Sequence, residues 1–376
     1  MPVILKAPFP YFGGKSAIAG QVWQRFGAVI NYVEPFFGSG AVLLGRPDWR
    51  PGERLVETVN DADGLLCNFY RALKADPEGV AQAADWPVNE CDLHARHIWL
   101  VGQREALTDR LMGDPDWFDA KAAGWWVWGA CCWIGSGWCS GRGPWVAHDG
   151  RMMRRDEAAN AGQGINRKLP HMGDAGQGIN RQLPHMGGGR GVKRQLPHMG
   201  AGQGIKRQLP HMGDAGRGVW APDWHLFPLA DRLRGVRVAC GDWTRVASPG
   251  FIVRGSGHVG TAAVLLDPPY DEGVGYTAGG GVSGAVWTWA CENGGNPLLR
   301  IAVCGYDDGR EVPPGWRVLP WATRGGYGNQ SEDGEGRANA RRERVWFSPH
   351  CIPCEGDIDC ATGEAVQGVG QMGLFG

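Results

Sequence analysis

Residues 31–44 read NYVEPFFGSGAVLL, and three successive patterns in this stretch predict a doubly wound α/β fold. The first four residues are predicted to form a strand. Gly38 and Gly40 follow it and allow a tight turn in which the backbone can approach a ligand closely. The apolar residues 41–44 then begin a helix. The turn is similar to the cofactor loop of such folds, although it is one glycine short of the full G-x-G-x-x-G fingerprint.

The next predicted strand supports this interpretation of the glycine turn. It spans residues 54–59, RLVETV, and ends at Asn60 and Asp61. Asp61 follows Gly38 by 23 residues, close to the spacing of about 20 at which an acid after the second strand binds a ribose hydroxyl. An amphipathic helix is predicted over residues 65–73 and should end near Pro77.

A second candidate site follows the apolar run of residues 262–266, AAVLL, which is typical of a buried parallel strand. Asp267 comes directly after this run, at the strand end where α/β sheets bind ligands. Pro268 and Pro269 lack N–H groups and have fixed φ angles, so they predict a stiff turn with free carbonyls. Asp267 and the Pro268 carbonyl could accept N–H bonds from a planar ring, with Tyr270 stacked on its face. The alternative is an ordinary turn with a solvated acid.

Residues 7–20 are predicted to form a loop that leads into a helix. Gly13 and Gly14 allow a tight turn, and Ser16 is a candidate N-cap. Lys15 would then lie near a helix N-terminus, where the helix dipole disfavours a cation. We therefore expect Lys15 to bind an anion such as a carboxylate, and the alternative is a solvated lysine in a turn.

The composition indicates a protein of the cytoplasm that does not enter the membrane. The chain has 376 residues, 43% of them hydrophobic, and its formal net charge is −1. It contains no apolar run of the 18 or more residues that a membrane span needs, and its first residues lack the apolar core of a signal peptide. A reducing compartment would keep its 11 cysteines as thiols. Any nucleic-acid binding must come from local basic patches.

Residues 78–145 are predicted to be mainly helical and are rich in tryptophan. Runs such as WWVW at residues 125–128 are too apolar for a solvated surface, so we expect most of these rings to lie in a core. The alternative is a pocket wall or a stacking platform for bases.

An internal repeat occupies residues 161–219. The motif LPHMG occurs four times, beginning at Leu169, Leu183, Leu196 and Leu209, and basic residues precede each copy. Residues 151–220 carry 12 Lys and Arg against four acids, a net charge of +8. The segment is predicted to be either a flexible Gly-rich array or a basic arm that binds phosphates. No thiol or acid accompanies each histidine, so no metal site is predicted.

The remaining strands are predicted at residues 236–240, 299–304, 316–319 and 342–347, the last as a hairpin partner. Residues 355–376 are expected to be frayed. Cys351 and Cys354 form a single C-x-x-C, which without a second pair does not predict zinc.

Four of these motifs, taken together, resemble those of the Dam-type DNA adenine N6-methyltransferases, in the order of that family's alpha group. Residues 11–15, YFGGK, look like its N-terminal cofactor motif, and residues 34–40, EPFFGSG, look like its glycine loop. Asn60 and Asp61 look like its ribose-binding acid, and residues 267–270, DPPY, look like its catalytic tetrapeptide. The regions that carry the resemblance are residues 5–75 and 235–350, about half of the chain.

The resemblance implies a Rossmann-like S-adenosylmethionine-dependent methyltransferase fold with a seven-stranded mixed sheet and an inserted, mainly helical target-recognition domain. It also implies S-adenosylmethionine as the methyl donor and the N6 amino group of a flipped-out adenine as acceptor. The implied catalytic residues are Asp267, Pro268, Pro269 and Tyr270. The implied cofactor-binding residues are Tyr11, Lys15, Glu34, Phe36, Gly38, Gly40, Asp61 and Asp267, with Lys15 on the methionine carboxylate.

The resulting domain prediction is a catalytic domain in two parts, residues 1–77 and 235–350. The target-recognition region, residues 78–234, lies between them and includes the repeat, and residues 351–376 form a tail. The expected partner is double-stranded DNA, with a cognate restriction endonuclease as a further candidate, and the protein is expected to be a monomer or a weak dimer.

Three other interpretations remain open from the sequence. An N4-cytosine DNA methyltransferase would share the fold, although Ser more often replaces Asp267 there. A non-catalytic nucleic-acid-binding module is disfavoured because Lys15, Asp61 and Asp267 are all present. A nicotinamide enzyme is disfavoured by the incomplete glycine fingerprint and by the Pro-Pro turn.

Overall fold

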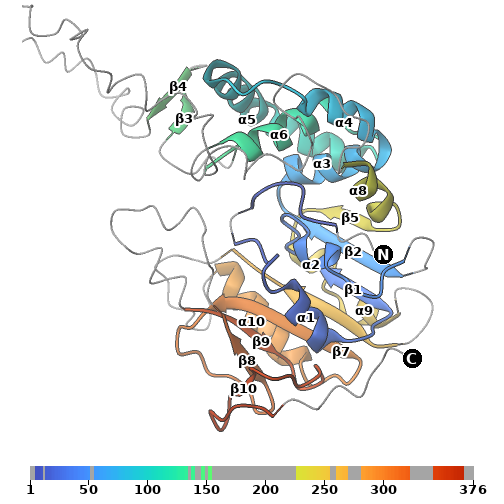
Figure 1. Cartoon of the computed structure of the whole chain (residues 1–376), viewed down its shortest axis with the longest axis vertical. Helices are drawn as coiled ribbons and strands as arrows, with labels where there is room; N and C mark the ends of the chain where they lie inside the picture. Colours follow the sequence, from blue (N-terminus) through green and yellow to red (C-terminus); the bar gives the residue numbers. More distant parts are fainter. Residues whose placement is uncertain are drawn as a thin grey trace, which may run out of the picture.

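The structure is a computed structural model that describes residues 5–11, 13–50, 55–133, 137–139, 145–148, 151–154, 226–254, 260–269, 281–321 and 342–367. Figure 1 shows its elements in chain order, which are α1 (Ala19–Phe26), β1 (Asn31–Glu34), α2 (Ala41–Leu44), β2 (Val56–Asp61), α3 (Gly64–Ala75), α4 (Pro77–Ala84), α5 (Glu90–Gly113), α6 (Ala120–Cys132), β3 (Trp145–His148), β4 (Arg151–Arg154), α8 (Leu226–Leu233), β5 (Arg237–Cys240), η3 (Trp243–Arg245), α9 (Pro249–Arg254), β6 (Ala262–Leu266), α10 (Gly281–Asn293), β7 (Leu299–Tyr306), β8 (Arg317–Pro320), β9 (Glu343–Phe347) and β10 (Ile358–Asp359).

One mixed sheet organises the fold. Its strand order is β10-β8-β9-β7-β6-β1-β2-β5. The five strands from β7 to β5 are parallel to one another. β9 runs antiparallel to β7 and to β8, as the hairpin prediction required. The described residues form eight strands in this sheet rather than the predicted seven, because the two-residue strand β10 pairs with the outer edge of β8.

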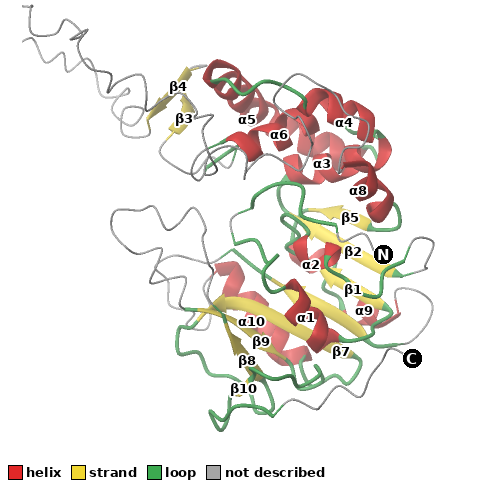
Figure 2. Ribbon diagram, in the orientation of Figure 1, coloured by secondary structure: helices red, strands yellow, loops and turns green. Residues whose placement is uncertain are grey.

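The middle of the sheet is buried on both faces, and its strand β6 is apolar throughout. All five residues of β6 are buried. Ala263 and Leu265 join the core beneath α1, α2 and α3, whereas Val264 and Leu266 join a second core beneath α9 and α10. This alternation is what a pleated strand covered by helices on both sides requires. The result is a three-layer arrangement, seen in Figure 2 as a central sheet with helices around it.

Helices α4, α5 and α6 belong to the region predicted for target recognition, and they gather with α3 and α8 at one end of the molecule (Figure 1). One hydrophobic core runs from α3 into these helices and includes Leu66, Phe69, Val80, Leu100 and Val127. Trp126 and Trp128 lie in this core with exposed fractions of 4% and 1%, as the interpretation of the tryptophan runs predicted. The repeat of residues 161–219 lies outside the described residues.

The described part of the segment predicted to be frayed, residues 355–367, is folded against the sheet. Asp357 has no exposed surface, and its Oδ1 accepts a hydrogen bond of 2.7 Å from Arg25 Nε of α1. Arg317 Nε of β8 lies 3.8 Å from the other carboxylate oxygen. The expectation failed because a buried ion pair between residues more than 300 positions apart holds this segment, and a local sequence pattern contains no sign of it.

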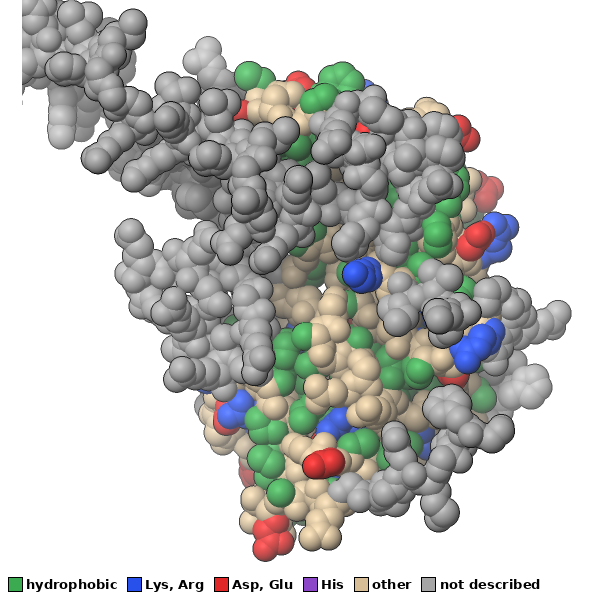
Figure 3. Space-filling model, in the orientation of Figure 1, with side chains coloured by type: hydrophobic (Ala, Val, Ile, Leu, Met, Phe, Trp, Pro, Cys, Tyr) green, Lys and Arg blue, Asp and Glu red, His purple; other side chains and the backbone are tan. Residues whose placement is uncertain are grey.

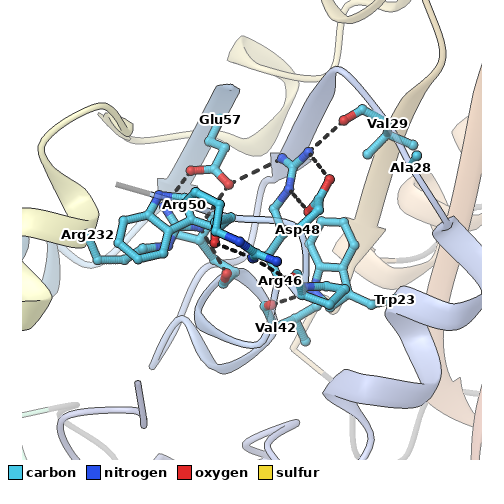
Figure 4. A network of polar contacts seen from close by, with 12 residues as sticks. Trp23, Ala28, Val29, Val42, Arg46, Asp48, Arg50, Glu57 and Arg232 are labelled. Atoms are coloured by element: carbon cyan, nitrogen blue, oxygen red, sulfur yellow. Dashed lines mark hydrogen bonds and ion pairs between the residues drawn. The ribbon is translucent and has the colours of Figure 1, made fainter. Parts of the chain in front are cut away.

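A second buried network joins α8 to the sheet (Figure 4). Glu57 of β2 is 3% exposed and accepts hydrogen bonds from Arg232 Nη1 at 2.6 Å and from Arg232 Nη2 at 2.8 Å. Arg46 Nη1 donates to the same carboxylate at 3.3 Å and Arg46 Nε donates to Asp48 at 2.8 Å. Because α8 is the first described helix after the repeat, this network fixes where the chain returns to the sheet.

Within the described part of the chain, every helix is too short or too polar to cross a membrane.

Candidate active site

The predicted site residues gather where the strand order reverses. β1 has β2 on one side and β6 on the other, and the chain builds outward from β1 in both directions. The crevice outside the carboxyl ends of strands at such a switch point is where doubly wound sheets bind ligands. Glu34 ends β1 and Asp267 follows β6, so both lie at this point, and Asp61 ends the neighbouring β2.

An ion pair between Lys15 and Asp267 forms the centre of the site. Lys15 Nζ lies 2.7 Å from Asp267 Oδ2 and donates a second hydrogen bond of 2.7 Å to the Gly13 carbonyl. The Lys15 side chain is 5% exposed and the Asp267 side chain is 20% exposed. Burial alone would lower the pKa of Lys15, but the attraction of Asp267 outweighs it and raises that pKa. Lys15 is therefore a buried ammonium whose main counter-charge is the predicted catalytic acid.

Lys15 was predicted to lie near a helix N-terminus, and this prediction is wrong. α1 begins at Ala19, and its N-cap is Ile18, which makes no side-chain capping bond. Ser16 is exposed in the turn before the helix. The cation is tolerated because it is held by a carboxylate and a carbonyl in a loop, away from the helix dipole.

The Pro-Pro turn is arranged partly as predicted. Pro268 is buried and Pro269 is exposed. The Pro269 carbonyl is not free, because Ser283 Oγ in the first turn of α10 donates to it at 2.8 Å. This bond anchors the turn to α10. Tyr270 lies outside the described residues, as does Phe12.

Asp61 is hydrogen-bonded to the glycine loop. Its Oδ2 accepts a hydrogen bond of 3.0 Å from the Gly38 N–H, and its Oδ1 accepts one of 2.9 Å from the Asp63 N–H. Burial raises the pKa of Asp61 to about 6, although these backbone bonds oppose the rise. The Tyr70 hydroxyl donates to the Gly38 carbonyl at 3.0 Å and holds the loop from its other side.

The glycines of this loop are required by both conformation and space. Gly38 has φ 48° and Gly40 has φ 69°, which are left-handed values that glycine adopts without strain. A Cβ at Gly38 would lie 2.7 Å from the Tyr11 ring, and one at Gly40 would lie 2.6 Å from the Phe37 ring. Tyr11 therefore packs directly against the loop, while its side chain remains 43% exposed.

Glu34 and Phe36 differ in how exposed their side chains are at the site. Glu34 is 4% exposed, and its Oε2 accepts the Tyr32 hydroxyl at 2.8 Å. Burial raises the pKa of Glu34 well above its ordinary value. Phe36 is half-buried, and its ring lies 6.1 Å from that of Trp243. Phe37 is 3% exposed and packs on Tyr70, so of the two rings only Phe36 is open to a ligand.

The structure adds residues to which the sequence assigned no role. Asp242 and Trp243 follow β5, beside the end of β2, and Asp242 Oδ1 accepts the Thr244 N–H at 2.9 Å. Glu343 begins β9. The centre of a Trp321 ring lies 5.9 Å from Lys15 Nζ. The available signal for Asp242 was its position close behind a predicted strand, where other site residues also lie. Glu343 gave no such signal, because it lies at the beginning of its strand.

An α/β sheet of this order, with an antiparallel strand beside β7 and acids after β1, β2 and β6, is consistent with the methyltransferase fold. Residues 11–90 match the family model of the D12 class N6 adenine-specific DNA methyltransferases. Over these residues the match agrees with the predicted Dam-type family and with the predicted class of enzyme, an adenine-specific DNA methyltransferase. The matched segment contains Tyr11, Lys15, the glycine loop and Asp61, and it ends before β6. No match was found among curated proteins.

Proposed function

We propose that this protein transfers a methyl group from S-adenosylmethionine to the N6 amino group of an adenine flipped out of double-stranded DNA at a specific site. The family match supports adenine methylation in DNA. The observation that carries the finer proposal is the buried Lys15–Asp267 pair at the switch point of the sheet. It combines a cation suited to an amino-acid carboxylate with an anion suited to an exocyclic amino group.

The residues present fit S-adenosylmethionine. The crowded contact between Gly38 and the Tyr11 ring leaves no room for a side chain, as expected of a loop that cradles a ligand with its backbone. Lys15 would bind the methionine carboxylate, and a charge-assisted hydrogen bond of this kind contributes about 1.5–3 kcal/mol. Asp61 would bind a ribose hydroxyl, since a carboxylate has about four lone-pair positions and the two backbone bonds leave some of them free. Tyr11, Phe36, Glu34 and the loop glycines would line the remainder.

The chemistry assigned to the Pro-Pro turn follows from the weak nucleophilicity of an aromatic amino group, whose lone pair is delocalised into the ring. Asp267 and the Pro268 carbonyl would accept its two N–H bonds, favour a tetrahedral nitrogen and free its lone pair. Tyr270 would stack on the flipped base. When bound, S-adenosylmethionine supplies a sulfonium methyl group that is displaced onto N6, with a neutral thioether as leaving group. The amino proton that N6 loses would pass to Asp267 and then to water, to which that side chain is 20% exposed.

Electrostatics and alignment would contribute most of the rate. The Lys15–Asp267 pair would hold the acceptor oxygens of Asp267 in place before the base arrives. Base flipping is needed because N6 is inaccessible in a stacked duplex, and its cost of a few kcal/mol would be offset by contacts to the extruded base. Asp267, rather than the Ser that is more frequent in N4-cytosine enzymes, favours adenine over the cytosine alternative.

DNA recognition is assigned to residues 78–234. On the face shown in Figure 3, the Lys and Arg side chains of the described residues are separated from one another. The concentrated basic charge is that of residues 151–220, with 12 Lys and Arg against four acids, so this segment is the best candidate for phosphate contacts. We assign base reading to the helical part and the β3–β4 hairpin. The proposed state is a monomer or weak dimer, and a cognate endonuclease remains a candidate partner.

The proposal is tested by expressing the protein in a methylation-deficient host and sequencing the DNA by a long-read method that distinguishes modified bases. The expected product is N6-methyladenine at one short motif, and it should be absent with Asp267→Ala. N4-methylcytosine as the product would favour the alternative enzyme. Methylation by the wild type that survives in Asp267→Ala would contradict the assigned site.

A further inference from the structure

Glu343 is a buried acid beside the site to which neither the sequence motifs nor the family match assigns a role. It begins β9 opposite Tyr306, at the end of β7. Val345 and Phe347, which follow it at alternate positions, lie in the same core as Cys304 of β7, whereas Trp346 lies in the core on the other face. Strand alternation therefore directs the Glu343 side chain to the face that carries Lys15.

Among the described residues, one oxygen of Glu343 has no hydrogen-bond partner. The residue is 7% exposed, and its Oε2 is buried without a hydrogen bond. A buried carboxylate oxygen in this condition is costly unless a donor or a cation reaches it. Burial raises the pKa of Glu343, and Lys15 is the principal group that opposes this rise. Of the charged groups that act on Glu343, the Lys15 ammonium is therefore the one that favours its ionised form.

The proposed reaction gives Lys15 a need for a second acid. Asp267 is its counter-charge in this structure, but the same carboxylate must accept an N–H bond from the target amino group. An ammonium that is 95% buried cannot lose its main counter-charge without a large penalty. Glu34 is the other buried acid near it, but the Tyr32 hydroxyl already occupies Glu34 Oε2. Glu343 is the acid with an open oxygen.

We propose that Glu343 is a positioning residue that holds the Lys15 ammonium while Asp267 bonds to the target amino group, and thereby keeps Lys15 directed at the carboxylate of the methyl donor. This inference rests on the proposed function. Glu343 touches neither the reacting nitrogen nor the methyl group in this role, and its effect passes entirely through Lys15.

The test compares two ligands that differ in the amino-acid portion. S-adenosylhomocysteine carries the carboxylate, whereas 5′-methylthioadenosine has the same adenosine without it. Calorimetry in the presence of DNA that carries the methylated motif, where Asp267 is engaged by the target base, gives the ratio of their affinities. This ratio reports on the amino-acid portion, its carboxylate and its ammonium, because Asp61 and the glycine loop meet the part that both ligands share. In Glu343→Gln this ratio should fall about tenfold, the loss expected for one charge-assisted bond. Lys15→Met should lower it at least as much.

The double variant decides whether Glu343 acts through Lys15. If it does, adding Glu343→Gln to Lys15→Met should change the ratio no further. Glu343→Asp keeps the charge and should retain most of the ratio. Arg344→Gln is the matched control: it removes a charge from the next residue of β9, whose side chain pairs with Asp307 at 3.0 Å on the other face, and it should leave the ratio unchanged.

The pH dependence of the affinity ratio provides a second test, because a purely structural role of Glu343 would not produce it. Glu343 holds Lys15 only when ionised, so the wild-type ratio should fall as pH falls through the raised pKa of Glu343. In Glu343→Gln this component should disappear. The other groups that act on Lys15, namely Asp267, Glu34 and Cys304, are present in both proteins, so the difference between the two curves belongs to Glu343.

Several outcomes would overturn the inference. An unchanged or larger ratio in Glu343→Gln would show that Glu343 does not support Lys15 or that it repels the carboxylate. Equal weakening of both ligands would assign it a structural role, and additive effects in the double variant would separate it from Lys15. Failure of the proposed function looks different, because the wild type would then bind neither ligand.

Discussion

Replacement of Arg232 by Met should destabilise the fold strongly, because it removes the main partner of a buried acid. Arg232 is 2% exposed and donates twice to Glu57 at 2.6 and 2.8 Å, in the bidentate geometry that makes Arg–carboxylate pairs strong. It also donates to the Leu43 carbonyl at 3.1 Å. Met preserves much of the volume, so the loss should report the polar contacts rather than a cavity.

The magnitude follows from the remaining partners. Removing one member of a buried ion pair costs about 3–5 kcal/mol, because the other charge is left without compensation. Arg46 stays 3.3 Å from Glu57, so we expect a loss of about 3 kcal/mol, near the lower limit. The control is Arg234→Met, just past the end of α8. Arg234 pairs with Asp231 at 2.9 Å, but their side chains are 82% and 72% exposed, so this change should cost at most about 1 kcal/mol.

Urea unfolding followed by intrinsic tryptophan fluorescence measures both variants. Glu57→Gln and the double variant with Arg232→Met complete the cycle, and the double variant should be less destabilised than the sum of the two single changes. The reasoning is refuted if Arg232→Met and Arg234→Met shift the unfolding midpoint equally. It is also refuted if the losses of Arg232 and Glu57 add, since two residues in one ion pair cannot act independently.

Three further predictions concern the site and the repeat. Asp267→Ala should lower methyl transfer more than tenfold with an unchanged fold, since an acceptor for the amino group is lost; residual activity above about a tenth, a cost under about 1.4 kcal/mol, would contradict the assignment. Asp61 has its pKa raised to about 6 by burial, so its ionisation destabilises the fold. As pH rises from about 4 to 6, wild-type stability should decrease relative to Asp61→Asn by about 3 kcal/mol, and denaturation midpoints that change in parallel across this range would disprove the shift. Deletion of residues 161–217 should leave the methylated motif unchanged but weaken DNA binding, and the slope of log affinity against log salt concentration should become shallower by several units. Unchanged affinity and slope would mean that the repeat is inert, and a new methylated motif would place sequence recognition in the repeat.

The parallel strands could be predicted because each is a local pattern. β6 is confirmed at residues 262–266, since five consecutive apolar residues before a Pro-Pro turn have few other uses in an α/β protein. The strand ends that carry Asp61 and Asp267 followed from the rule that such sheets bind ligands at their carboxyl edge. The glycine loop was predictable for the same reason, because its two left-handed positions require glycine.

The partners of these residues could not be predicted. The acid that binds Lys15 lies 252 residues away, and a sequence pattern favours an anion near that lysine without identifying which one. β10 escaped prediction because only the buried Arg25–Asp357 pair and the edge of β8 make it a strand. Glu343 escaped because the antiparallel direction of β9 brings the beginning of that strand, rather than its end, to the active edge.

The position of Asp61 links the stability of the site to its capacity to bind. Its carboxylate holds the glycine loop through Gly38 and the start of α3 through Asp63, and it is also the proposed ribose acceptor. The burial that raises its pKa to about 6 means that protonation begins only slightly below neutral pH. Protonation of Asp61 removes the free-energy cost of burying its charge, but it also removes one acceptor position with which Asp61 could bind the ribose. Stability and affinity for the adenosine portion should therefore change in opposite directions as pH falls through 6. Asn could accept only one of the two backbone bonds, so the acid serves both the loop and the proposed ribose contact.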